Sequence, residues 1–491
     1  NNVNVSGNLN VDGTVDLNNT LTVDGTAIFN NNVNVSGDLT LKNISSSNLH
    51  YRNLYTINDD GLMEYPESVS YINNYLAIGI PSNNSSTGLV KIYLYNNGYW
   101  KYIQEFVGDN AGDQFGKSVS IDQFGGYIIL SVGAPGNTSN TGIVKTYYYF
   151  SSSWTLLSAL SGDSTNDKFG TSISLIIVGF GIQLAIGAPG NTLNKGSVKI
   201  YEGTLSTLTF NQMGTTLSGY STSDEFGTSV SLIYNGTNSQ VAIGAPGNTS
   251  NTGVVNIYEY NSTTSSWGLL GSSINGDSTN DKLGTSLSLI YNGTNSQVAI
   301  GAPGNTSNTG RVKIYQYDGT SSWLQLGSNI DGDSTSDEFG TSVSLFYNGT
   351  NSQVAIGAPG SKYVKIYQYD GSLWSQFDST LSGASSSISF GNSIILSDNR
   401  LIINEHTTTY DSISIGVVQI YELNDSILCN GDIELTGDLY LHDNIIVNGY
   451  STFNGTTTFN NQITSNYDLY VVKDVNVSGN LDVSGTVDLN D

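Results

Sequence analysis

A repeat with a period near 56 residues fills most of the chain and constrains the fold more than any other feature. Its clearest marker is the tetrapeptide Val-Lys-Ile-Tyr or a close variant. The marker occurs seven times, at 90–93, 144–147, 198–201, 255–258, 312–315, 364–367 and 418–421. Self-similarity at a fixed period of this length is typical of repeat architectures, so we expect seven copies of one structural unit.

Two further markers keep their order within the repeat. The proline of an Ala-Pro-Gly segment or its variant recurs as Pro81, Pro135, Pro189, Pro246, Pro303 and Pro359. A Phe-Gly pair recurs at Phe115, Phe169, Phe226, Phe339 and Phe390, with Leu283 in the fifth unit. Each unit also holds four runs of β-forming residues bounded by Gly, Asn or Ser, as in "TSVSLIY", "SQVAIGAP", "VVNIYEY" and "SSWGLLGSSI". Four strands in each of seven units predict a seven-bladed β-propeller.

Closure of this propeller needs one more outer strand, because only six outer strands lie between the seven markers. The candidates are the first and last runs of the region, 54–59 and 426–432. The small residues of "AIGAPG" are expected where the backbones of neighbouring blades approach each other. A structural role between blades is expected for the tryptophans of the outer strands, Trp100, Trp154, Trp267, Trp323 and Trp374.

Both ends of the chain have a period of six. Two apolar residues at alternate positions are followed by a turn residue, usually Gly or Asn, which tolerate positive φ. This pattern predicts a hexapeptide β-solenoid, or a trimeric fibre shaft in which three chains share one core, rather than a disordered Asn/Gly linker. The segments 3–18 and 475–490 differ at only two of their sixteen positions.

The expected fold class is therefore all-β, with a seven-bladed β-propeller inserted between two hexapeptide-repeat β-solenoid or fibre-shaft segments. The expected domains are a hexad segment at 1–48, the propeller at 49–430 and a second hexad segment at 431–491. The sequence does not begin with Met, which suggests a processed product or an excised piece.

The repeat resembles the FG-GAP family, whose best-known members form the propeller head of integrin α subunits. The resemblance covers about 53–430 and rests on the Phe-Gly, Gly-Ala-Pro and Lys-Ile-Tyr markers recurring in order. It implies the seven-bladed fold and an extracellular recognition role. Family members often bind calcium in an Asp-rich hairpin, but the corresponding loops, such as "YNGTNSQ" at 234–240, contain no carboxylate. The hexad ends resemble viral and phage fibre proteins.

Pairs of aspartates recur in a different loop, in segments such as "GDSTNDKFG". Two carboxylates with nearby carbonyls suit a weak Ca²⁺ site, while capping of backbone N–H groups in a turn is the alternative. The candidate ligands are Asp163, Asp167, Asp277, Asp281, Asp333 and Asp337. No other cofactor is expected.

Charge and composition narrow the function. A net charge of −25 disfavours nucleic acid and anionic membranes as partners, and the most apolar stretch, 175–190, is too short to insert into a membrane. The three histidines are His50, His406 and His442, and none lies in a repeated loop with a nucleophile and an orienting acid, so no catalytic residues and no enzymatic activity are expected.

Two functions remain. The first is a structural subunit of an extracellular, cell-surface or virion-surface fibre or filament. The second is an adhesin or receptor-binding protein whose propeller face recognises a glycan or a protein. For the first, we expect self-association, as a head-to-tail filament or a homotrimeric shaft. The predicted assembly residues are Val3, Val5, Leu9, Val11, Val475, Val477, Leu481 and Val483.

Overall fold

The computed structural model describes residues 39–40, 50–57, 65–96, 99–204, 209–397, 400–408 and 414–424, together with eight three-residue strands between 427 and 471. The chain forms two compact units. The larger unit is His50–Asn424, and the smaller one combines Asn1–Leu49 with Asp425–Asp491. The larger unit is therefore inserted in the sequence between the two parts of the smaller unit.

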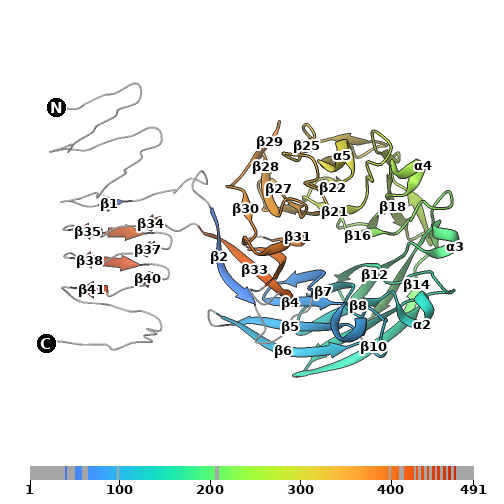
Figure 1. Cartoon of the computed structure of the whole chain (residues 1–491), viewed down its shortest axis with the longest axis horizontal. Coiled ribbons are helices and arrows are strands. Elements are labelled where there is room, and N and C mark those ends of the chain that lie inside the picture. The colour runs from blue at the N-terminus through green and yellow to red at the C-terminus, as the bar shows by residue number, and fades with distance from the viewer. Residues whose placement is uncertain are drawn as a thin grey trace. The chain divides into compact units, whose positions relative to one another are not determined.

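The larger unit is a seven-bladed β-propeller, as the repeats predict (Figure 1). Its seven antiparallel sheets follow one another in sequence order, so the ribbon colour in Figure 1 passes from blue through green and yellow to orange around the ring. The first strand of each sheet lies against the first strand of the next sheet. These first strands therefore surround the axis of the ring, and the later strands of each blade lie progressively further out.

In the first three blades the strands follow one another in sequence order from the axis outward. Blade 1 consists of β3 (Ser68–Ile72), β4 (Tyr75–Ile80), β5 (Leu89–Asn96) and β6 (Tyr99–Val107). Blade 2 consists of β7 (Ser118–Phe124), β8 (Tyr127–Ala134), β9 (Ile143–Phe150) and β10 (Ser153–Ser161). Blade 3 consists of β11 (Ser172–Val178), β12 (Gly181–Ala188), β13 (Ser197–Thr204), β14 (Phe210–Gln212) and β15 (Leu217–Ser218).

The next three blades repeat the pattern of blade 3, in which two short strands pair with the third strand. Blade 4 consists of β16 (Ser229–Tyr234), β17 (Ser239–Ala245), β18 (Val254–Asn261), β19 (Ser266–Leu269) and β20 (Ile274–Asn275). Blade 5 consists of β21 (Ser286–Tyr291), β22 (Ser296–Ala302), β23 (Arg311–Tyr317), β24 (Trp323–Gln325) and β25 (Ile330–Asp331). Blade 6 consists of β26 (Ser342–Tyr347), β27 (Ser352–Ala358), β28 (Tyr363–Tyr369), β29 (Trp374–Gln376) and β30 (Leu381–Ser382).

Blade 7 closes the ring with strands from both ends of the unit. Its inner strands are β31 (Ser387–Leu396), β32 (Arg400–Thr408) and β33 (Ser414–Asn424), and its outermost strand is β2 (His50–Ile57). Of the two candidates for the closing strand, the first run is thus correct. The last run was the wrong candidate, because its strand β34 (Ile427–Cys429) pairs in the smaller unit instead.

In blades 1 to 5 the second and third strands are joined by one helical turn. The turns are α1 (Asn83–Ser86), α2 (Asn137–Asn140), α3 (Asn191–Asn194), α4 (Asn248–Asn251) and α5 (Asn305–Asn308). Each turn contains residues with positive φ; in α5 they are Thr306, with φ 48°, Ser307, with φ 57°, and Asn308, with φ 62°. The turns are therefore tight loops rather than regular helices, and they lie near the aspartate loops described below.

Serine hydroxyls link the inner strands of all seven blades. In each case the backbone N–H of one inner strand donates to a serine Oγ of the preceding blade, over 2.9 to 3.3 Å. The accepting serines are Ser70, Ser120, Ser174, Ser231, Ser288, Ser344 and Ser393. The last bond runs from Val69 back to Ser393 and completes the circle, which explains why serines alternate with apolar residues in "TSVSLIY".

Close packing between blades uses the small residues and tryptophans in the way the sequence predicts. A Cβ atom at Gly79 would lie 2.1 Å from the carbonyl oxygen of Gly116 in the next blade, so only glycine fits. On the outer strands, the indole N–H of Trp323 donates to the carbonyl oxygen of Leu270 in the preceding blade. The Phe-Gly phenylalanines, such as Phe339, are almost fully buried between blades.

The smaller unit contains short parallel strands. They are β1 (Leu39–Thr40), β34, β35 (Ile433–Leu435), β36 (Leu439–Leu441), β37 (Ile445–Val447), β38 (Ser451–Phe453), β39 (Thr457–Phe459), β40 (Ile463–Ser465) and β41 (Leu469–Val471). Each strand from β34 to β38 pairs with the strand that begins 18 residues later, as in Ile427 with Ile445 and Ile445 with Ile463 (445 − 427 = 463 − 445 = 18). Strand β1 pairs in parallel with β36, so that Leu39 lies opposite Leu439.

Candidate functional site

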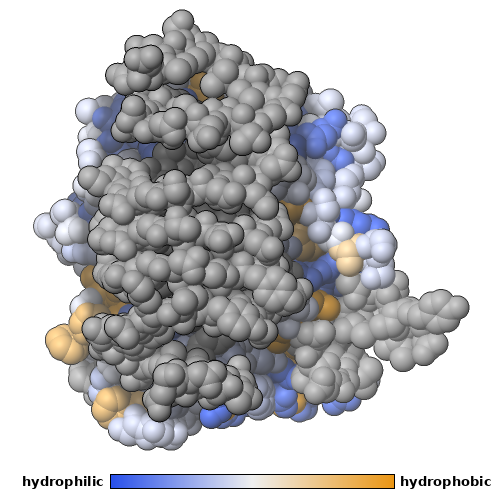
Figure 2. All heavy atoms as spheres, turned by 90° about the vertical axis from the view of Figure 1, so that its left-hand side faces the viewer, coloured by the Kyte–Doolittle hydropathy of each residue, from blue (hydrophilic) through white to orange (hydrophobic). Residues whose placement is uncertain are grey.

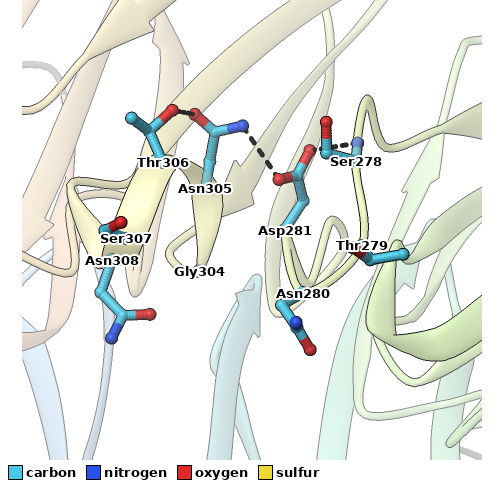
Figure 3. Close-up of a pocket in the computed structure, with 9 residues that line it drawn as sticks. All are labelled: Ser278, Thr279, Asn280, Asp281, Gly304, Asn305, Thr306, Ser307 and Asn308. Atoms are coloured by element: carbon cyan, nitrogen blue, oxygen red, sulfur yellow. Dashed lines mark hydrogen bonds between the residues drawn. The ribbon is translucent and has the colours of Figure 1, made fainter.

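The second aspartate of each recurring pair is buried and holds its own loop together. Asp281 is 3% exposed, and its Oδ2 accepts the backbone N–H groups of Asp277 at 3.0 Å and Ser278 at 2.9 Å. Its Oδ1 accepts the side-chain amide of Asn305 in α5 at 3.0 Å (Figure 3). Because both carboxylate oxygens have donors, the aspartate joins the loop before blade 5 to the α5 turn within that blade.

The same arrangement recurs around the ring. Asp167 accepts Asn191, and Asp224 accepts Asn248, each over 3.1 Å. In blade 6 the partner changes, because Asp337 accepts the hydroxyl groups of Ser361 and Tyr363. Burial opposes ionisation, but these hydrogen bonds hold the pKa of Asp337 below its ordinary value.

The first aspartate of each pair forms an ion pair with the lysine of the Lys-Ile-Tyr marker. Lys313 lies 2.5 Å from Asp277, and Arg311 approaches the same carboxylate at 3.0 Å. Partial burial raises the pKa of Asp277, but the two cations outweigh it and keep that pKa below its ordinary value. Equivalent pairs join Asp109 to Lys145, Asp163 to Lys199 and Asp333 to Lys365.

Blade 4 departs from this pattern at both positions together. Tyr220 stands where the loop has its first aspartate, and Asn256 stands where the strand has its lysine. Asn256 is fully buried, so a lysine there would have no carboxylate to neutralise it. Loss of the anion and loss of the cation in the same blade indicate that the repeat keeps the pair as a unit.

These contacts bear on the six aspartates proposed as calcium ligands. The structure brings each pair into one loop, as the sequence predicts, but directs the first carboxylate toward a lysine and the second toward N–H groups. A shallow hollow of about 410 Å³ lies beside Asp281 and is lined by the 278–281 and 304–308 loops (Figure 3). Within the described parts of the chain, no three His, Cys, Asp or Glu side chains gather closely enough to hold a metal ion. Calcium binding by these aspartates therefore stays a prediction, which an experiment described in the Discussion tests.

A second hollow, of about 360 Å³, lies where the inner strands of blades 6, 7, 1 and 2 begin. We call it the axial hollow and define it by Tyr65, Glu67, Lys117, Thr341, Asn392 and His406. Glu67 and Lys117 form an ion pair across it. His406 is 9% exposed, and its Nε2 atom has no hydrogen-bond partner among the described residues.

The sequence pattern singled out only His406 from this set. The other members were missed because the first repeat unit is degenerate around 65–68 and its Phe-Gly marker is not recognisable. The signal that could have found them is the residue after each Phe-Gly pair, which is Thr in four units but Lys117 and Asn392 in two others.

The predicted assembly residues, from Val3 to Val11 and from Val475 to Val483, lie outside the described residues. No helix within the described ranges is both long and apolar enough to cross a membrane. Exposed apolar side chains of the propeller are distributed over several blades, as with Phe180, Leu193 and Leu324. Where coloured residues are visible in Figure 2, hydrophobic residues form small groups between hydrophilic ones.

Comparison with known proteins adds no assignment. No protein-family model matches the chain, and no curated protein matches it in sequence. The resemblance to the FG-GAP family therefore depends on the repeated motifs alone.

Proposed function

We propose that the protein is a structural subunit of an extracellular or virion-surface fibre, in which a β-propeller bead is carried on a β-solenoid shaft. The observation that supports this most is the parallel ladder of the smaller unit. Its offset of 18 residues equals three hexads per coil, which is how a three-sided solenoid is built.

Strand β1 of the first hexad segment belongs to the same ladder as β36 of the second. Leu39 pairs with Leu439 although 400 residues separate them (439 − 39 = 400). The sequences around the two strands agree, since "GDLTLKN" at 37–43 aligns with "GDLYLHD" at 437–443. The shaft is thus proposed to be one solenoid, interrupted within a coil by the inserted propeller, rather than two separate segments.

A single solenoid explains why hexad repeats flank the propeller on both sides in the sequence. Hexad coils cannot bury their apolar faces alone and must stack on a neighbour, so a solenoid end is a template for another solenoid. Head-to-tail stacking of such ends produces open filaments rather than closed dimers. The FG-GAP resemblance agrees with an extracellular location.

Engineered disulfides test the continuous solenoid. Thr40 lies opposite Tyr440, and neighbouring parallel strands are about 4.8 Å apart, within reach of a disulfide. In a Cys429→Ser background, Thr40→Cys with Tyr440→Cys should cross-link within one chain on mild oxidation. The control pairs Thr40→Cys with Thr458→Cys, one strand further along the ladder and about 9.6 Å away, which is too far. Mass spectrometry of peptides measures the cross-linking. The proposed ladder is contradicted if both pairs cross-link equally or if neither pair does.

Electron microscopy of the intact protein tests the fibre. Beads at regular intervals along a shaft support the proposal, and separate particles at all protein concentrations contradict it. The second candidate function, recognition of a ligand by the propeller, is favoured by the axial hollow.

A further inference from the structure

The axial hollow coincides with the place where the sevenfold repeat is broken. One position, directly after each Phe-Gly pair or its counterpart, lies just before the inner strand in blades 1 to 6 and within β31 in blade 7. In blades 3 to 6 it is threonine, and each threonine hydroxyl donates to a carbonyl oxygen in its own turn over 2.7 to 2.8 Å. These hydroxyls are thus already satisfied locally.

The other three blades carry different residues at this position. They are Asn392 in blade 7, Glu67 in blade 1 and Lys117 in blade 2, which are consecutive around the ring. Asn392 and Glu67 are exposed. The Asn392 amide makes only a long contact to Ser389 Oγ, at 3.5 Å, and the Lys117 ammonium pairs with Glu67 rather than with its own turn. All three line the hollow. The break in the repeat therefore brings an amide, a carboxylate and an ammonium group together at one end of the axis.

Two aromatic substitutions accompany this change. Tyr65 takes the place of the buried phenylalanine of the Phe-Gly pair and is 38% exposed, whereas Phe115 is 1% exposed. His406 takes the place of the Ala-Pro-Gly proline in blade 7. The two rings meet edge to face, with centroids 3.8 Å apart. The hollow thus has a partly exposed aromatic wall beside a buried imidazole.

Closure of the ring explains the nearby substitution of Asn404 but not those of Tyr65 and His406. Asn404 replaces the glycine at which blades approach, and its amide donates to the carbonyl oxygen of Pro66 at 2.7 Å. That bond joins blade 7 to blade 1. His406 makes no comparable bond through Nε2, and a buried polar atom without a partner carries the cost of its lost hydration. A ligand hydroxyl at this atom would remove that cost.

From this juxtaposition we propose that the axial hollow binds a neutral sugar unit of a glycan, which stacks on Tyr65 and donates or accepts hydrogen bonds at His406, Asn392, Glu67 and Lys117. This ligand role goes beyond the proposed structural function. The volume suits one small ligand unit, and a few convergent polar groups beside an aromatic wall are typical of binding pockets.

The charges of the hollow favour a neutral ligand. Glu67 and Lys117 neutralise each other, and the net charge of −25 repels anions. Burial lowers the pKa of His406, so its ring is neutral at pH 7 and one nitrogen accepts while the other donates. A hydroxyl group is both donor and acceptor, so it fits Nε2 in either tautomer.

Binding is tested on the intact protein with methyl glycosides of glucose, galactose, mannose, fucose and N-acetylglucosamine, by saturation-transfer NMR and calorimetry. N-acetylneuraminate and glucosamine serve as charged comparisons. At least one neutral glycoside should bind with Kd in the millimolar range, around 1 mM, and more tightly than either charged sugar. Binding of no neutral glycoside overturns the proposal and leaves water as the occupant of the hollow.

Variants locate the site. Asn392→Thr restores the residue of the other blades and should weaken binding about tenfold or more without lowering Tm. The matched control, Thr171→Asn, makes the reverse change at the equivalent position of blade 3, away from the hollow, and should leave Kd unchanged. Equal effects of the two variants overturn the assignment.

His406→Phe keeps an aromatic ring against Tyr65 but removes Nε2. It should weaken binding about tenfold and raise Tm or leave it unchanged, because the buried atom without a partner is gone. Unchanged affinity overturns the role of His406. Electron micrographs of the same proteins separate the two proposals. Fibres without any sugar binding would contradict the sugar site alone, and sugar binding without fibres would contradict the structural function alone.

Discussion

At the scale of single residues, the propeller is held together by polar contacts that repeat with the blades. A buried aspartate closes the loop before each of blades 2 to 6. Except in blade 4, an aspartate–lysine pair also joins that loop to the third strand of the following blade, as with Asp163 and Lys199. Such pairs contribute modestly where they are exposed, but the lysines are more buried than their partners; the Lys313 side chain is 7% exposed. Removal of the carboxylate would therefore leave a largely buried ammonium group without its ion-pair partner.

Blade 4 lacks the aspartate–lysine ion pair, so the contribution of that pair to stability can be measured by introducing it there. Asn256→Lys alone buries a charge without a partner and should lower the free energy of unfolding by about 3 kcal/mol. Tyr220→Asp alone should change it little, because Tyr220 is 62% exposed. The double variant should recover about 2 kcal/mol or more of the loss. Denaturant unfolding of the four proteins measures the coupling, and strictly additive effects would show that the two positions do not form a pair.

Calcium binding can be decided at the same residues. If an ion bound between Asp277 and Asp281, added Ca²⁺ would raise Tm by mass action, and Asp277→Asn with Asp281→Asn would remove the gain. Because Lys313 and backbone N–H groups already occupy these oxygens, we expect millimolar Ca²⁺ and a chelator to leave Tm unchanged. A rise in Tm that the double variant abolishes would establish the calcium site instead.

At the scale of elements, the fold follows from the repeats, and the closing strand was the step that they left open. The small residues of "AIGAPG" and the tryptophans of the outer strands predicted contacts between blades, whereas the serine hydrogen bonds between inner strands were not predicted. The period of six at the ends fixed strand length but not the number of hexads in a coil, because any number of hexads per coil preserves it. The 18-residue offset between Ile427 and Ile445 comes from backbone pairing that one sequence does not reveal.

The candidate sites, too, could be predicted from the sequence only in part. The aspartate–lysine pairs had a readable signal, since Asp163 and Lys199, like Asp277 and Lys313, are 36 residues apart. The axial hollow had almost none, because its residues come from four blades and meet only when the ring closes. Tyr65 and Glu67 are recognisable as the counterparts of Phe115 and Lys117 only because Ser68 and Ser118 make the same contact to the next blade.

Truncation tests the role of β2 as the closing strand. A chain of residues 50–424 keeps β2 and should have the Tm of the propeller in the intact protein. A chain of residues 58–424 lacks it, leaves the edge of β33 unpaired and uncovers its apolar side, so Tm should fall by about 5 °C or more. Calorimetry compares the two; equal Tm values would mean that β2 does not close the ring.

At the scale of the whole molecule, the marker tyrosines respond alike in every blade. Burial raises the pKa of all seven above its ordinary value of 10.0, Tyr315 included. In the other six the pKa rises to about 12: Tyr93, Tyr147, Tyr201, Tyr258, Tyr367 and Tyr421. The folded state therefore keeps these protons after the unfolded chain has lost them. Their contribution to stability is complete below pH 10 and is lost as the pH rises toward 12.

We accordingly expect Tm to fall steeply between pH 10 and 12. The phenolate absorbance should rise in two stages, first from exposed tyrosines and then together with unfolding. Replacement of one marker tyrosine by phenylalanine, as in Tyr367→Phe, should make the fall slightly shallower. A Tm that stays constant to pH 12 would contradict the shared rise in pKa.

The proposed assembly would depend most on the two hexad segments. Strand β1 pairs with β36, so removal of residues 1–43 takes away the partner of Leu439 and Tyr440 and leaves that edge of the ladder open. The truncated protein should keep the propeller, with the Tm of the 50–424 chain, but should no longer form fibres with the native bead spacing.

Charged substitutions test the same joint without removing strands. Val5→Asp, Leu9→Asp and Val11→Asp would place charge at the apolar positions of the hexads, where stacking coils are proposed to bury them, and burial of an unpaired charge is strongly unfavourable. As a control, Asn4→Asp, Asn8→Asp and Asn10→Asp add the same charge at the intervening polar positions. Fibre formation, followed by light scattering and electron microscopy, should be lost in the first variant and retained in the second. If both variants form fibres with the same bead spacing, the hexad segments are not the joint, and the contact between subunits must lie on the propeller.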